Sequence, residues 1–364
     1  MVGSAPGAGS IGRVGPPPLD RPARILVLTG LYPTRDRPGL GPFVRRRVEA
    51  LAARGVDVRV VAPRDRGRSV ALRLLDLLVR GLTLRPGFDG VEGHVLYPDG
   101  LVALLVARLR RRPLLIYAHG ADVREAATRN RAHRRLARLV ARSADAVVTN
   151  SAATAELVAG LGRRAEVIPP GVDLERFRPA SSAECRTALG LPNEGLLALY
   201  VGTLSRRKGA DVFAEGIAGS PGWLGVMVGD GDLMPVLRSE HPNLHLVGPV
   251  APDAVPDWID AADVVVVPSR EEPLGLAAVE ALACGVPVVA SATGGLREIV
   301  RDDVSGFLVP PDDPGALAAA LGRFQDPGLR GRLAGAARES VAAHDIRVTS
   351  EAMAAVWRTL GVSA

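Results

Sequence analysis

The sequence predicts an α/β protein of two domains, each a parallel sheet with helices on both faces. Short apolar runs alternate with amphipathic helical patterns, and repeated βα units of this kind form parallel sheets. The length, 364 residues, corresponds to about two domains. The charge balance is +15 over residues 1–178 and −9 over residues 179–364. One barrel of about eight β/α units is the alternative, but this charge step and the turn-forming segment 169–192 favour two domains.

Each predicted strand of the first half is an apolar run with the length of a buried parallel strand, and each predicted helix repeats its apolar residues at helical spacing. The strands are expected at 24–29, 56–61, 93–97, 113–118, 145–149 and 165–168. The helices between them are expected at about 42–54, 69–84, 99–110, 130–142 and 152–161.

The second half continues the same alternation. Its strands are expected at 196–202, 223–228, 244–247, 263–267, 286–290 and 306–309. Its helices are expected near 209–218, 232–239, 253–261, 275–284, 295–300 and 314–325, and the last 35 residues have a helical pattern. Two Rossmann-like halves joined in this way leave a cleft between the carboxyl ends of their sheets, where open α/β sheets bind ligands.

Composition divides the chain into four segments. Residues 1–20, rich in Gly, Pro and Ser, are predicted to be a disordered tail and not a signal peptide. Residues 21–175 and 176–345 are the two Rossmann-like domains, and residues 346–364 form a C-terminal helix that packs back on the first domain. The chain lacks an uncharged apolar run long enough to span a membrane. Its two cysteines fit a reducing cytoplasm.

The most informative stretch joins the strand at 264–267 to the helix at 275–284. Its loop contains the carboxylates Glu271 and Glu272, and the helix contains Glu280. Amides that open a helix bind phosphate without any side chain, so the N–H groups of residues 274–276 (Leu274, Gly275, Leu276) are a candidate phosphate site. Glu280 is expected to accept the hydroxyls of a ribose and Glu272 those of a sugar, whereas Glu271 reads as a surface acid.

Cations for the same phosphate are predicted in the turn at 202–209. Of the 45 basic residues 44 are arginine, and the single lysine, Lys208, lies in this turn beside Arg206 and Arg207. An ammonium supplies a mobile point charge and a guanidinium a bidentate contact. The alternative is that Lys208 is a chance survivor of an arginine-biased composition.

His119 is the candidate on the first domain. It ends the strand at 113–118 and is followed by Gly120 and Asp122, so it is expected to face the cleft. The alternative is a turn histidine that bonds to the backbone. Gly41, before the first helix, would let a phosphate or an acceptor approach the backbone, although a plain turn is nearly as good an explanation. The other five histidines form no ligand spacing, so they are assigned no role and no metal site is predicted.

These segments, taken together, resemble the family-4 retaining glycosyltransferases, which have the GT-B fold. The similar segments are Ala118 to Asp122, Ile168 to Asp173, Val201 to Gly209, Val228 to Gly231, Ala261 to Asp263, the Pro-Ser-x-x-Glu-Pro-x-Gly pattern with Glu272 and Glu280, and Gly294-Gly295 with Glu298. The resemblance covers about residues 24–360. One departure is Thr203, where the family often has arginine; Arg206 or Arg207 is expected to compensate for it.

The resemblance implies a transferase that moves a sugar from a nucleoside diphosphate, UDP or GDP foremost, to a hydroxyl of a glycan, glycolipid or lipid-linked acceptor. It implies that the second domain binds the nucleotide sugar and the first the acceptor, that the anomeric configuration is retained, and that no cofactor is required. It further implies that His119 contacts the donor sugar and that the backbone at Val247 contacts the base; loop packing explains Val247 equally well. A nucleotide-sugar epimerase of similar fold and a non-catalytic binder are the alternatives.

The basic first half suggests a partner of its own. Arg131, Arg134, Arg135, Arg138 and Arg142 fall on one face of a predicted helix, with Leu136, Leu139 and Val140 expected opposite them. Such a helix can lie on an anionic membrane, so docking on the inner face of the plasma membrane, to reach a lipid-linked acceptor, is a hypothesis. A solvated arginine face explains the pattern equally well. Nucleic-acid binding is disfavoured, since no aromatic stacking stripe accompanies the arginines.

Overall fold

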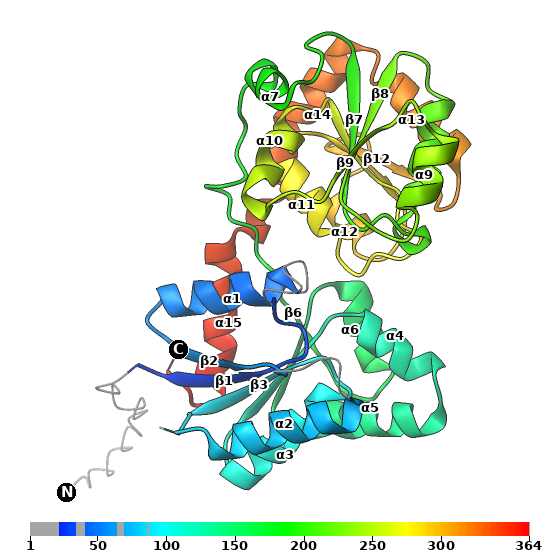
Figure 1. Cartoon of the computed structure of the whole chain (residues 1–364). Helices are drawn as coiled ribbons and strands as arrows, with labels where there is room; N and C mark the ends of the chain where they lie inside the picture. Colours follow the sequence, from blue (N-terminus) through cyan, green and yellow to red (C-terminus); the bar gives the residue numbers. More distant parts are fainter. Residues whose placement is uncertain (1–21, 34–40, 64–68, 86, 364) are drawn as a thin grey trace, which may run out of the picture.

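The computed structural model describes residues 22–33, 41–63, 69–85 and 87–363, so the predicted tail at 1–20 lies outside the described residues. These residues form two lobes stacked one above the other (Figure 1). Each lobe contains one six-stranded sheet, and all recorded strand pairs are parallel. The predicted fold class is confirmed. No helix in the described ranges combines the length and apolarity that a membrane crossing requires.

The N-terminal sheet has the order β2-β1-β3-β4-β5-β6. Its strands are β1 (Arg24–Leu28), β2 (Asp57–Val61), β3 (Gly90–His94), β4 (Leu114–Ala118), β5 (Ala146–Thr149) and β6 (Glu166–Val167). Its helices are α1 (Pro42–Ala53), α2 (Val70–Thr83), α3 (Asp99–Arg110), α4 (Ala121–Thr128), α5 (Arg131–Ser143) and α6 (Ala152–Ala159). Helix α2 packs on α3 and α3 on α5, so these three form one outer layer (Figure 1).

The predicted position of β3 is wrong. The strand spans Gly90–His94, three residues before the predicted range 93–97. Glycine is a weak strand former, which hid the true start, but a Cβ at Gly93 would lie 2.7 Å from Ile116 Cδ1 and 2.8 Å from Ala103 Cβ. Close packing between the strand and α3 therefore requires glycine there. The shift matters for function because it places His94 at the carboxyl end of the strand.

The C-terminal sheet has the order β12-β11-β10-β7-β8-β9. Its strands are β7 (Leu196–Val201), β8 (Trp223–Val228), β9 (His245–Gly248), β10 (Val264–Val267), β11 (Val288–Ser291) and β12 (Gly306–Val309). Its helices are α7 (Ser182–Leu189), α8 (Ala210–Ala218), α9 (Met234–Glu240), α10 (Val255–Asp260), α11 (Leu276–Ala283), α12 (Leu296–Ile299), α13 (Pro314–Arg323) and α14 (Pro327–Ser340). The described part of this half also contains three short 3₁₀ turns, η1 (Arg206–Lys208), η2 (Pro252–Ala254) and η3 (Ala342–His344).

Two helices were missed by the sequence analysis, α4 and α7. Helix α7 lies within the segment 169–192 that was assigned to turns. Its signals are in the sequence: the Ser181 side chain accepts a hydrogen bond from the Glu184 amide, and Gly190 ends the helix in a left-handed conformation. Serine at the first position and glycine after the last are the usual boundaries of a helix, but the surrounding prolines obscured them.

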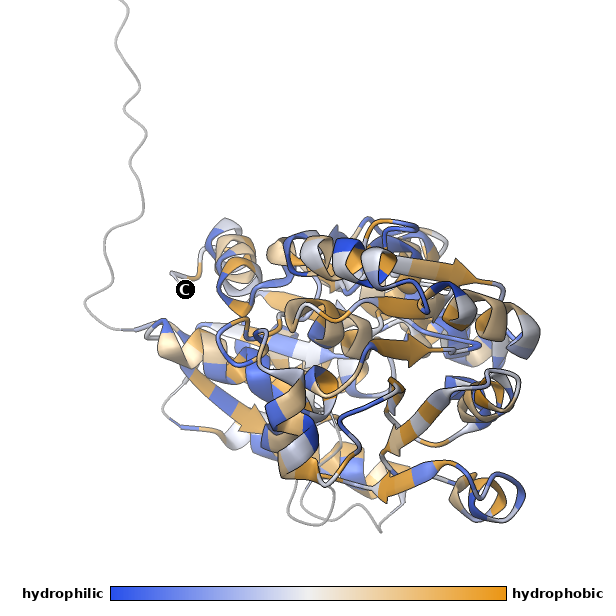
Figure 2. Ribbon diagram, turned by 90° about the horizontal axis from the view of Figure 1, so that it is seen from above, coloured by the Kyte–Doolittle hydropathy of each residue, from blue (hydrophilic) through white to orange (hydrophobic). Residues whose placement is uncertain are grey.

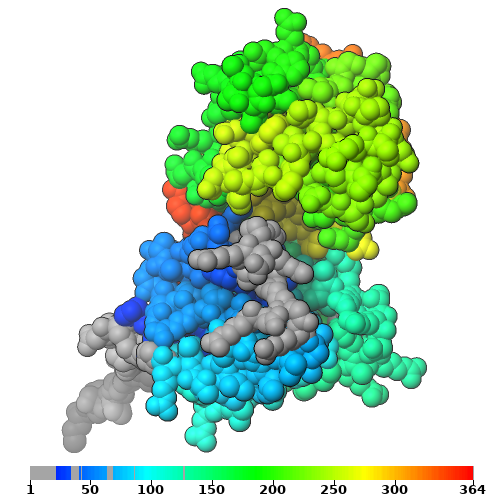
Figure 3. Space-filling view, viewed as in Figure 1, coloured from blue at the N-terminus to red at the C-terminus, as the bar shows by residue number. Residues whose placement is uncertain are grey.

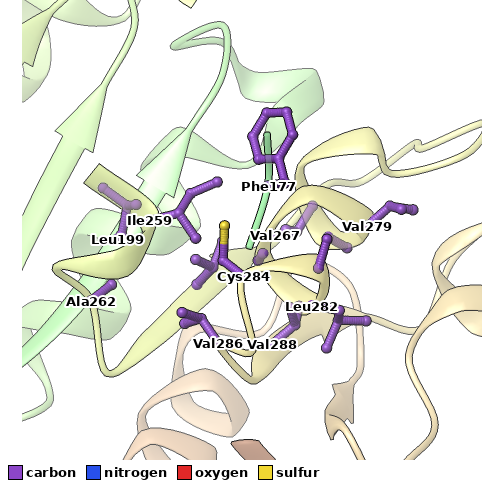
Figure 4. Packing of buried hydrophobic residues seen from close by; sticks show 14 of the residues in the cluster. Phe177, Leu199, Ile259, Ala262, Val267, Val279, Leu282, Cys284, Val286 and Val288 are labelled. Atoms are coloured by element: carbon purple, nitrogen blue, oxygen red, sulfur yellow. The ribbon is translucent and has the colours of Figure 1, made fainter. Parts of the chain in front are cut away.

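Apolar side chains fill both faces of each sheet. Figure 2 shows strands that are mostly apolar and helices of mixed polarity. On one face of the C-terminal sheet, α10 and α11 pack over the strands and enclose Leu199, Ile259, Leu282 and Val288 (Figure 4). On the other face, α8 and α13 cover the strands through residues such as Phe213 and Leu321.

The chain passes between the domains twice, and the two crossings are hydrogen-bonded to each other. The Val172 amide donates to the His344 carbonyl over 2.8 Å, and the Ile346 amide donates to the Val172 carbonyl over 2.9 Å. Beyond this point α15 (Ile346–Thr359) runs back along the N-terminal lobe and packs against α1 (Figure 1). Trp357 is fully buried there, and its ring fills the space where a Cβ at Gly90 would lie, 2.5 Å away.

Replacing Trp357 by alanine is expected to lower the free energy of unfolding by about 3–5 kcal/mol, because the cavity left by a large buried side chain adds to the lost apolar burial. Thermal and urea unfolding of the full chain measures the effect. Val348→Ala is the matched control, since Val348 lies on the same helix and is 53% exposed. Equal stability of the two variants would show that α15 does not contribute to the N-terminal core.

Candidate functional site

A cavity of about 560 Å³ lies between the domains, at the carboxyl ends of strands from both sheets. The space-filling view shows the two lobes meeting at a narrower waist (Figure 3). Both domains contribute to its wall. Among the candidates from the sequence, the lining includes Gly41, His119, Arg207, Lys208, Glu272, Leu274, Gly275 and Leu276. The lining set of this cavity does not contain Arg206, Val247 or Glu280.

The amino end of α11 opens into this cavity. Gly275 precedes the helix with φ +93°, a conformation that favours glycine. The loop before it is fixed by the glycine pair at 294–295: the Gly295 amide donates to the Glu272 carbonyl over 3.1 Å, and a Cβ at Gly294 would lie 2.0 Å from that carbonyl oxygen. The glycines therefore let two loops touch, and residues 274–277, where α11 begins, line the cavity.

Lys208 and Glu272 form an ion pair at the same end of the cavity. Lys208 Nζ lies 2.5 Å from Glu272 Oε2, and the Ser269 hydroxyl donates to the same oxygen over 3.1 Å. Lys208 closes the turn η1, and the left-handed Gly209 behind it lies so close to Pro268 that a Cβ would be 1.9 Å from the Pro268 carbonyl oxygen. An ammonium has three donors, so two remain for a second anion in the cavity.

The two arginines of this turn differ in position. Arg207 lines the cavity. The Arg206 side chain is 77% exposed, and its Nε lies 3.8 Å from Asp211 Oδ2, so the structure does not bring it to the site. Thr203, which stands where the family often has arginine, also lines the cavity, and its carbonyl accepts a hydrogen bond from the Tyr200 hydroxyl over 2.7 Å. Which of the two adjacent arginines reaches the cavity depends on the direction of each side chain, and the sequence does not contain that information.

Glu280 is buried one helical turn below the start of α11 and bonds to the other domain. Arg46 Nη1, on α1, donates to Glu280 Oε1 over 2.7 Å. Burial raises the pKa of Glu280 above its usual value, while the charge of Arg46 and its hydrogen bond act in the opposite direction. Glu280, which was predicted from local sequence to bind a ribose, connects the two domains in this structure. Sequence patterns gave no sign of this partner, which lies 234 positions away.

His119 lies at the carboxyl end of β4 and faces the C-terminal domain. Its amide donates to Asp122 Oδ1 over 2.9 Å, which fixes the turn. Gly120 has φ +89°, and a Cβ there would lie 3.0 Å from Pro273 Cβ in the loop before α11. The imidazole contacts two aromatic rings: the tilted ring of Phe43 at a centroid distance of 4.8 Å and the stacked ring of Tyr117 at 4.7 Å. Burial, followed by the charges of His94 and Arg47, lowers the pKa of His119 well below 6.5.

Behind His119 lies a row of buried polar side chains that the sequence analysis did not predict. His94 Nδ1 is 2.9 Å from His119 Nε2, His94 Nε2 is 2.9 Å from Glu92 Oε1, and Arg47 Nη2 is 3.0 Å from the same Glu92 oxygen. His94 had been assigned no role, and the structure corrects this. The signal was available, because parallel strands β3 and β4 are neighbours and polar residues at their carboxyl ends must meet; the misplaced β3 concealed it.

Gly41 and Asn150 complete the wall on the N-terminal side. Gly41 has φ +59°, and a Cβ there would lie 2.2 Å from the Leu31 carbonyl oxygen, so this turn requires glycine. Asn150 follows β5, and its amide donates to the His119 carbonyl over 3.2 Å. Asn150 was missed, although its place directly after a predicted strand is the same signal that identified His119.

Further carboxylates of the C-terminal domain meet the N-terminal domain around the cavity. Glu298 Oε2 and Oε1 accept hydrogen bonds from the Ala152 and Ala153 amides at the start of α6, over 2.9 Å and 3.1 Å. Glu271 Oε2 lies 3.9 Å from Arg124 Nε. The Arg46–Glu280 pair joins α1 to α11 in the same way. Part of the charge difference between the two halves of the chain is therefore used in contacts between the two domains. Among the described residues, no group of His, Cys, Asp or Glu side chains is arranged to hold a metal ion.

Two family profiles match the chain in the order of its domains. The profile described as "Glycosyltransferase Family 4" matches residues 39–176, and that described as "Glycosyl transferases group 1" matches residues 195–326. The chain is 34% identical to a D-inositol 3-phosphate glycosyltransferase of Catenulispora acidiphila, over 76% of this chain and 74% of that protein. It belongs to glycosyltransferase family 4.

A second family-4 relative, a D-inositol 3-phosphate glycosyltransferase of Acidothermus cellulolyticus, is 39% identical over 53% of this chain and 48% of that protein. The family-4 fold is also found in solved structures. Sucrose-phosphate synthase of Thermosynechococcus elongatus superposes with a TM-score of 0.82 at 26% identity, covering 94% of this chain and 99% of that one. Anabaena HepE, solved with UDP and glucose, has a TM-score of 0.77 at 21% identity and covers 93% and 100%. Against several curated relatives the match spans about half of their length.

Membership of family 4 places the chain among the glycosyltransferases, enzymes of class EC 2.4. The predicted resemblance is therefore confirmed, and neither the epimerase nor the non-catalytic binder finds support among these matches. The segments that the two profiles match lie on opposite sides of the cavity: one contains His119 and the other contains Lys208 and Glu272. The cavity between them is the candidate active site of this family-4 chain.

Proposed function

We propose that the protein transfers a sugar from a nucleoside diphosphate, UDP foremost, to a hydroxyl of a glycan, glycolipid or lipid-linked acceptor, with retention of the anomeric configuration. The observation that carries the proposal is the Lys208–Glu272 pair at the amino end of α11, facing His119 across one cavity. A solved relative of the same fold, Anabaena HepE, contains UDP and glucose, which supports a UDP-linked donor.

The chemistry follows from the charge that develops on the leaving group. Breaking the bond between sugar and diphosphate leaves negative charge on the diphosphate, and fixed donors aimed at that charge lower the barrier. Here the donors are the amides at the start of α11, Lys208 and Arg207. Glu272 accepts hydrogen bonds from the donor sugar, and Glu280 accepts those of the ribose. The acceptor hydroxyl attacks from the side on which the diphosphate leaves, and a phosphate oxygen takes its proton.

Donor binding should be visible as thermal stabilisation. A ligand that binds only the folded state raises the melting temperature by mass action. In a panel of UDP- and GDP-linked sugars, we expect sugars on one base to stabilise the full chain, and Glu280→Gln to reduce the shift for that base. We also propose that no metal is needed, so EDTA should leave the shift and turnover unchanged. If no donor shifted the melting temperature or released nucleoside diphosphate with any acceptor, including inositol phosphates, the proposed reaction would be wrong.

We further propose that the protein works in the cytoplasm with its N-terminal domain on an anionic membrane surface. The supporting surface is the outer layer of α2, α3 and α5. Its exposed apolar side chains are Val70, Leu72, Leu75, Val79, Leu105, Leu109 and Leu139. Leu139, which was expected opposite the arginines with Val140, is half exposed, whereas Val140 is buried. Exposed arginines lie on α5 beside them, and each basic residue near an anionic surface contributes about 1 kcal/mol.

Liposome flotation tests this surface. The full chain should float with vesicles that contain anionic phosphatidylglycerol and not with phosphatidylcholine alone. The double variant Leu72→Glu/Leu75→Glu should lose most of the binding, because two charges replace apolar contacts on α2. Val236→Glu is the control, since Val236 is similarly exposed on α9 of the other domain. Equal recovery of the α2 variant and the control would rule out this face as the docking surface.

A further inference from the structure

The buried side chains behind His119 form a row in which donors and acceptors follow in one order. Glu92 and His94 are almost fully buried, at 1% exposed, so solvent does not screen the contact between them. Burial opposes ionisation of Glu92, but the charge of Arg47 and the contact with His94 outweigh it and lower its pKa to about 2. Glu92 is therefore an anion at neutral pH, and an anionic carboxylate only accepts hydrogen bonds.

Because Glu92, at one end of the row, is an acceptor, it determines which nitrogen of each imidazole in the row carries a proton. Glu92 Oε1 lies 2.9 Å from His94 Nε2, although the two atoms lack the alignment of a hydrogen bond. An unprotonated Nε2 would place its lone pair beside an anionic oxygen at this distance, so His94 carries its proton on Nε2. Burial lowers the pKa of His94 below 6.5, so the ring is neutral and its Nδ1 has no proton. That Nδ1 lies 2.9 Å from His119 Nε2 and accepts its proton. A neutral His119 then carries its single proton on Nε2 and has an unprotonated Nδ1.

We propose that Glu92 and His94 are positioning residues that fix His119 in one neutral tautomer, with Nδ1 as the hydrogen-bond acceptor offered to the ligand. Without the carboxylate, the two imidazoles could exchange the direction of their shared hydrogen bond, and His119 would then present a donor. The Phe43 and Tyr117 rings fix the plane of the imidazole, and the row fixes its protons. This inference rests on the proposed function for its consequence: His119 would bind a sugar hydroxyl by accepting its proton.

The groups around His119 agree with a neutral ring. His94 approaches from β3, Tyr117 from β4, Phe43 from α1 and Asp122 from α4. Asp122 accepts the backbone amides of His119 and Leu96, so its two oxygens are engaged away from the imidazole. The charge of Arg47, whose Nη2 lies 3.0 Å from Glu92 Oε1, opposes protonation of His119 and lowers its pKa.

The tautomer can be measured without substrate or activity. The full chain labelled with ¹⁵N-histidine is examined by long-range ¹H–¹⁵N correlation spectroscopy, with the His119 signals assigned by His119→Gln. We expect protonated Nε2 and unprotonated Nδ1 at His119, unchanged into the mildly acidic range. The exposed His245 serves as the internal reference. A protonated Nδ1 at His119, or an imidazolium, in the unmodified chain overturns the proposal.

Three variants test the origin of the tautomer. Glu92→Gln keeps an acceptor oxygen for His94 and should retain the His119 pattern. Arg47→Leu/Glu92→Leu removes the carboxylate together with its cation, and His94→Leu removes the intermediate ring but leaves the buried ion pair; each should give a mixture of both tautomers. If one of these two does not fold, the other decides, and an unchanged His119 in it overturns the proposal. Because no donor is used, this result is independent of the nucleotide-sugar panel.

Discussion

Replacing Lys208 by alanine is expected to reduce kcat by about 10²–10³-fold, the effect of removing one preorganised donor from a developing negative charge. Lys208 Nζ lies 2.5 Å from Glu272 Oε2 at the end of the cavity where the diphosphate is proposed to lie. Its loss removes the mobile cation and also leaves the Glu272 carboxylate, 8% exposed, without its ion pair. Initial rates of nucleoside diphosphate release with the identified donor and acceptor provide the measurement.

Two controls separate this effect from a general loss of charge near the site. Glu271 is adjacent to Glu272, but its side chain is 59% exposed, and Arg206 is in the same turn as Lys208 and points away from the cavity. Glu271→Ala and Arg206→Ala are expected to stay within a few-fold of the unmodified rate. Unfolding curves for each variant show whether the fold is intact. Near-normal kcat in a folded Lys208→Ala variant would contradict the proposed role.

Replacing Arg47 by leucine is expected to lower the free energy of unfolding by about 3–5 kcal/mol, because an unpaired charge, Glu92, then remains buried. Arg47 Nη2 lies 3.0 Å from Glu92 Oε1, and both side chains are buried. The Arg47 guanidinium also lies over the Tyr117 ring, 4.5 Å from its centroid. Urea unfolding at neutral pH measures the change.

The double variant Arg47→Leu/Glu92→Leu should recover most of this loss, because replacing both members of a buried pair by apolar residues is often neutral. Arg45→Leu is the matched control on the same helix, since its partner Glu49 and Arg45 itself are exposed. Equal stability of Arg47→Leu and the double variant would show that the buried pair does not act as a unit.

The same pair sets the response of stability to acid. The pKa of Glu92 is about 2 in the folded chain, against an ordinary value of 4.5. A lowered folded pKa stabilises the protein fully above the unfolded value, and this contribution is lost as the pH falls from about 4.5 toward about 2. The double variant lacks the ionisable group and should lose less stability over that range.

The parts of the site that could be predicted have signals that lie within short segments of the sequence. A buried strand, an acidic loop and a helix start between residues 264 and 283 lie in one βα unit, so their order alone places Glu272 and the amides of residues 274–276 at the carboxyl end of a strand. Lys208 was identified because it is the one lysine of the chain. His119 followed from its place after a strand.

The parts that could not be predicted are pairs joined only by folding. The Arg46–Glu280 contact spans the two domains, and Arg206 and Arg207 look alike in sequence but point in different directions. His94 and Glu92 were missed because two glycines, Gly90 and Gly93, hid the start of β3 and the strand was predicted three residues too late. In each case the deciding contact is made by a side chain whose neighbour comes from another element.

The sequence by itself therefore determined the fold class, the family and one end of the cleft, because apolar periodicity and turn residues act over short stretches of chain. Only the tertiary structure decided which cations reach the cavity, how charges of opposite sign meet between the domains, and which buried acceptor orders the protons of His119. These properties depend on distances of about 3 Å between residues that are far apart in sequence, and such distances arise only when the sheets and helices have packed.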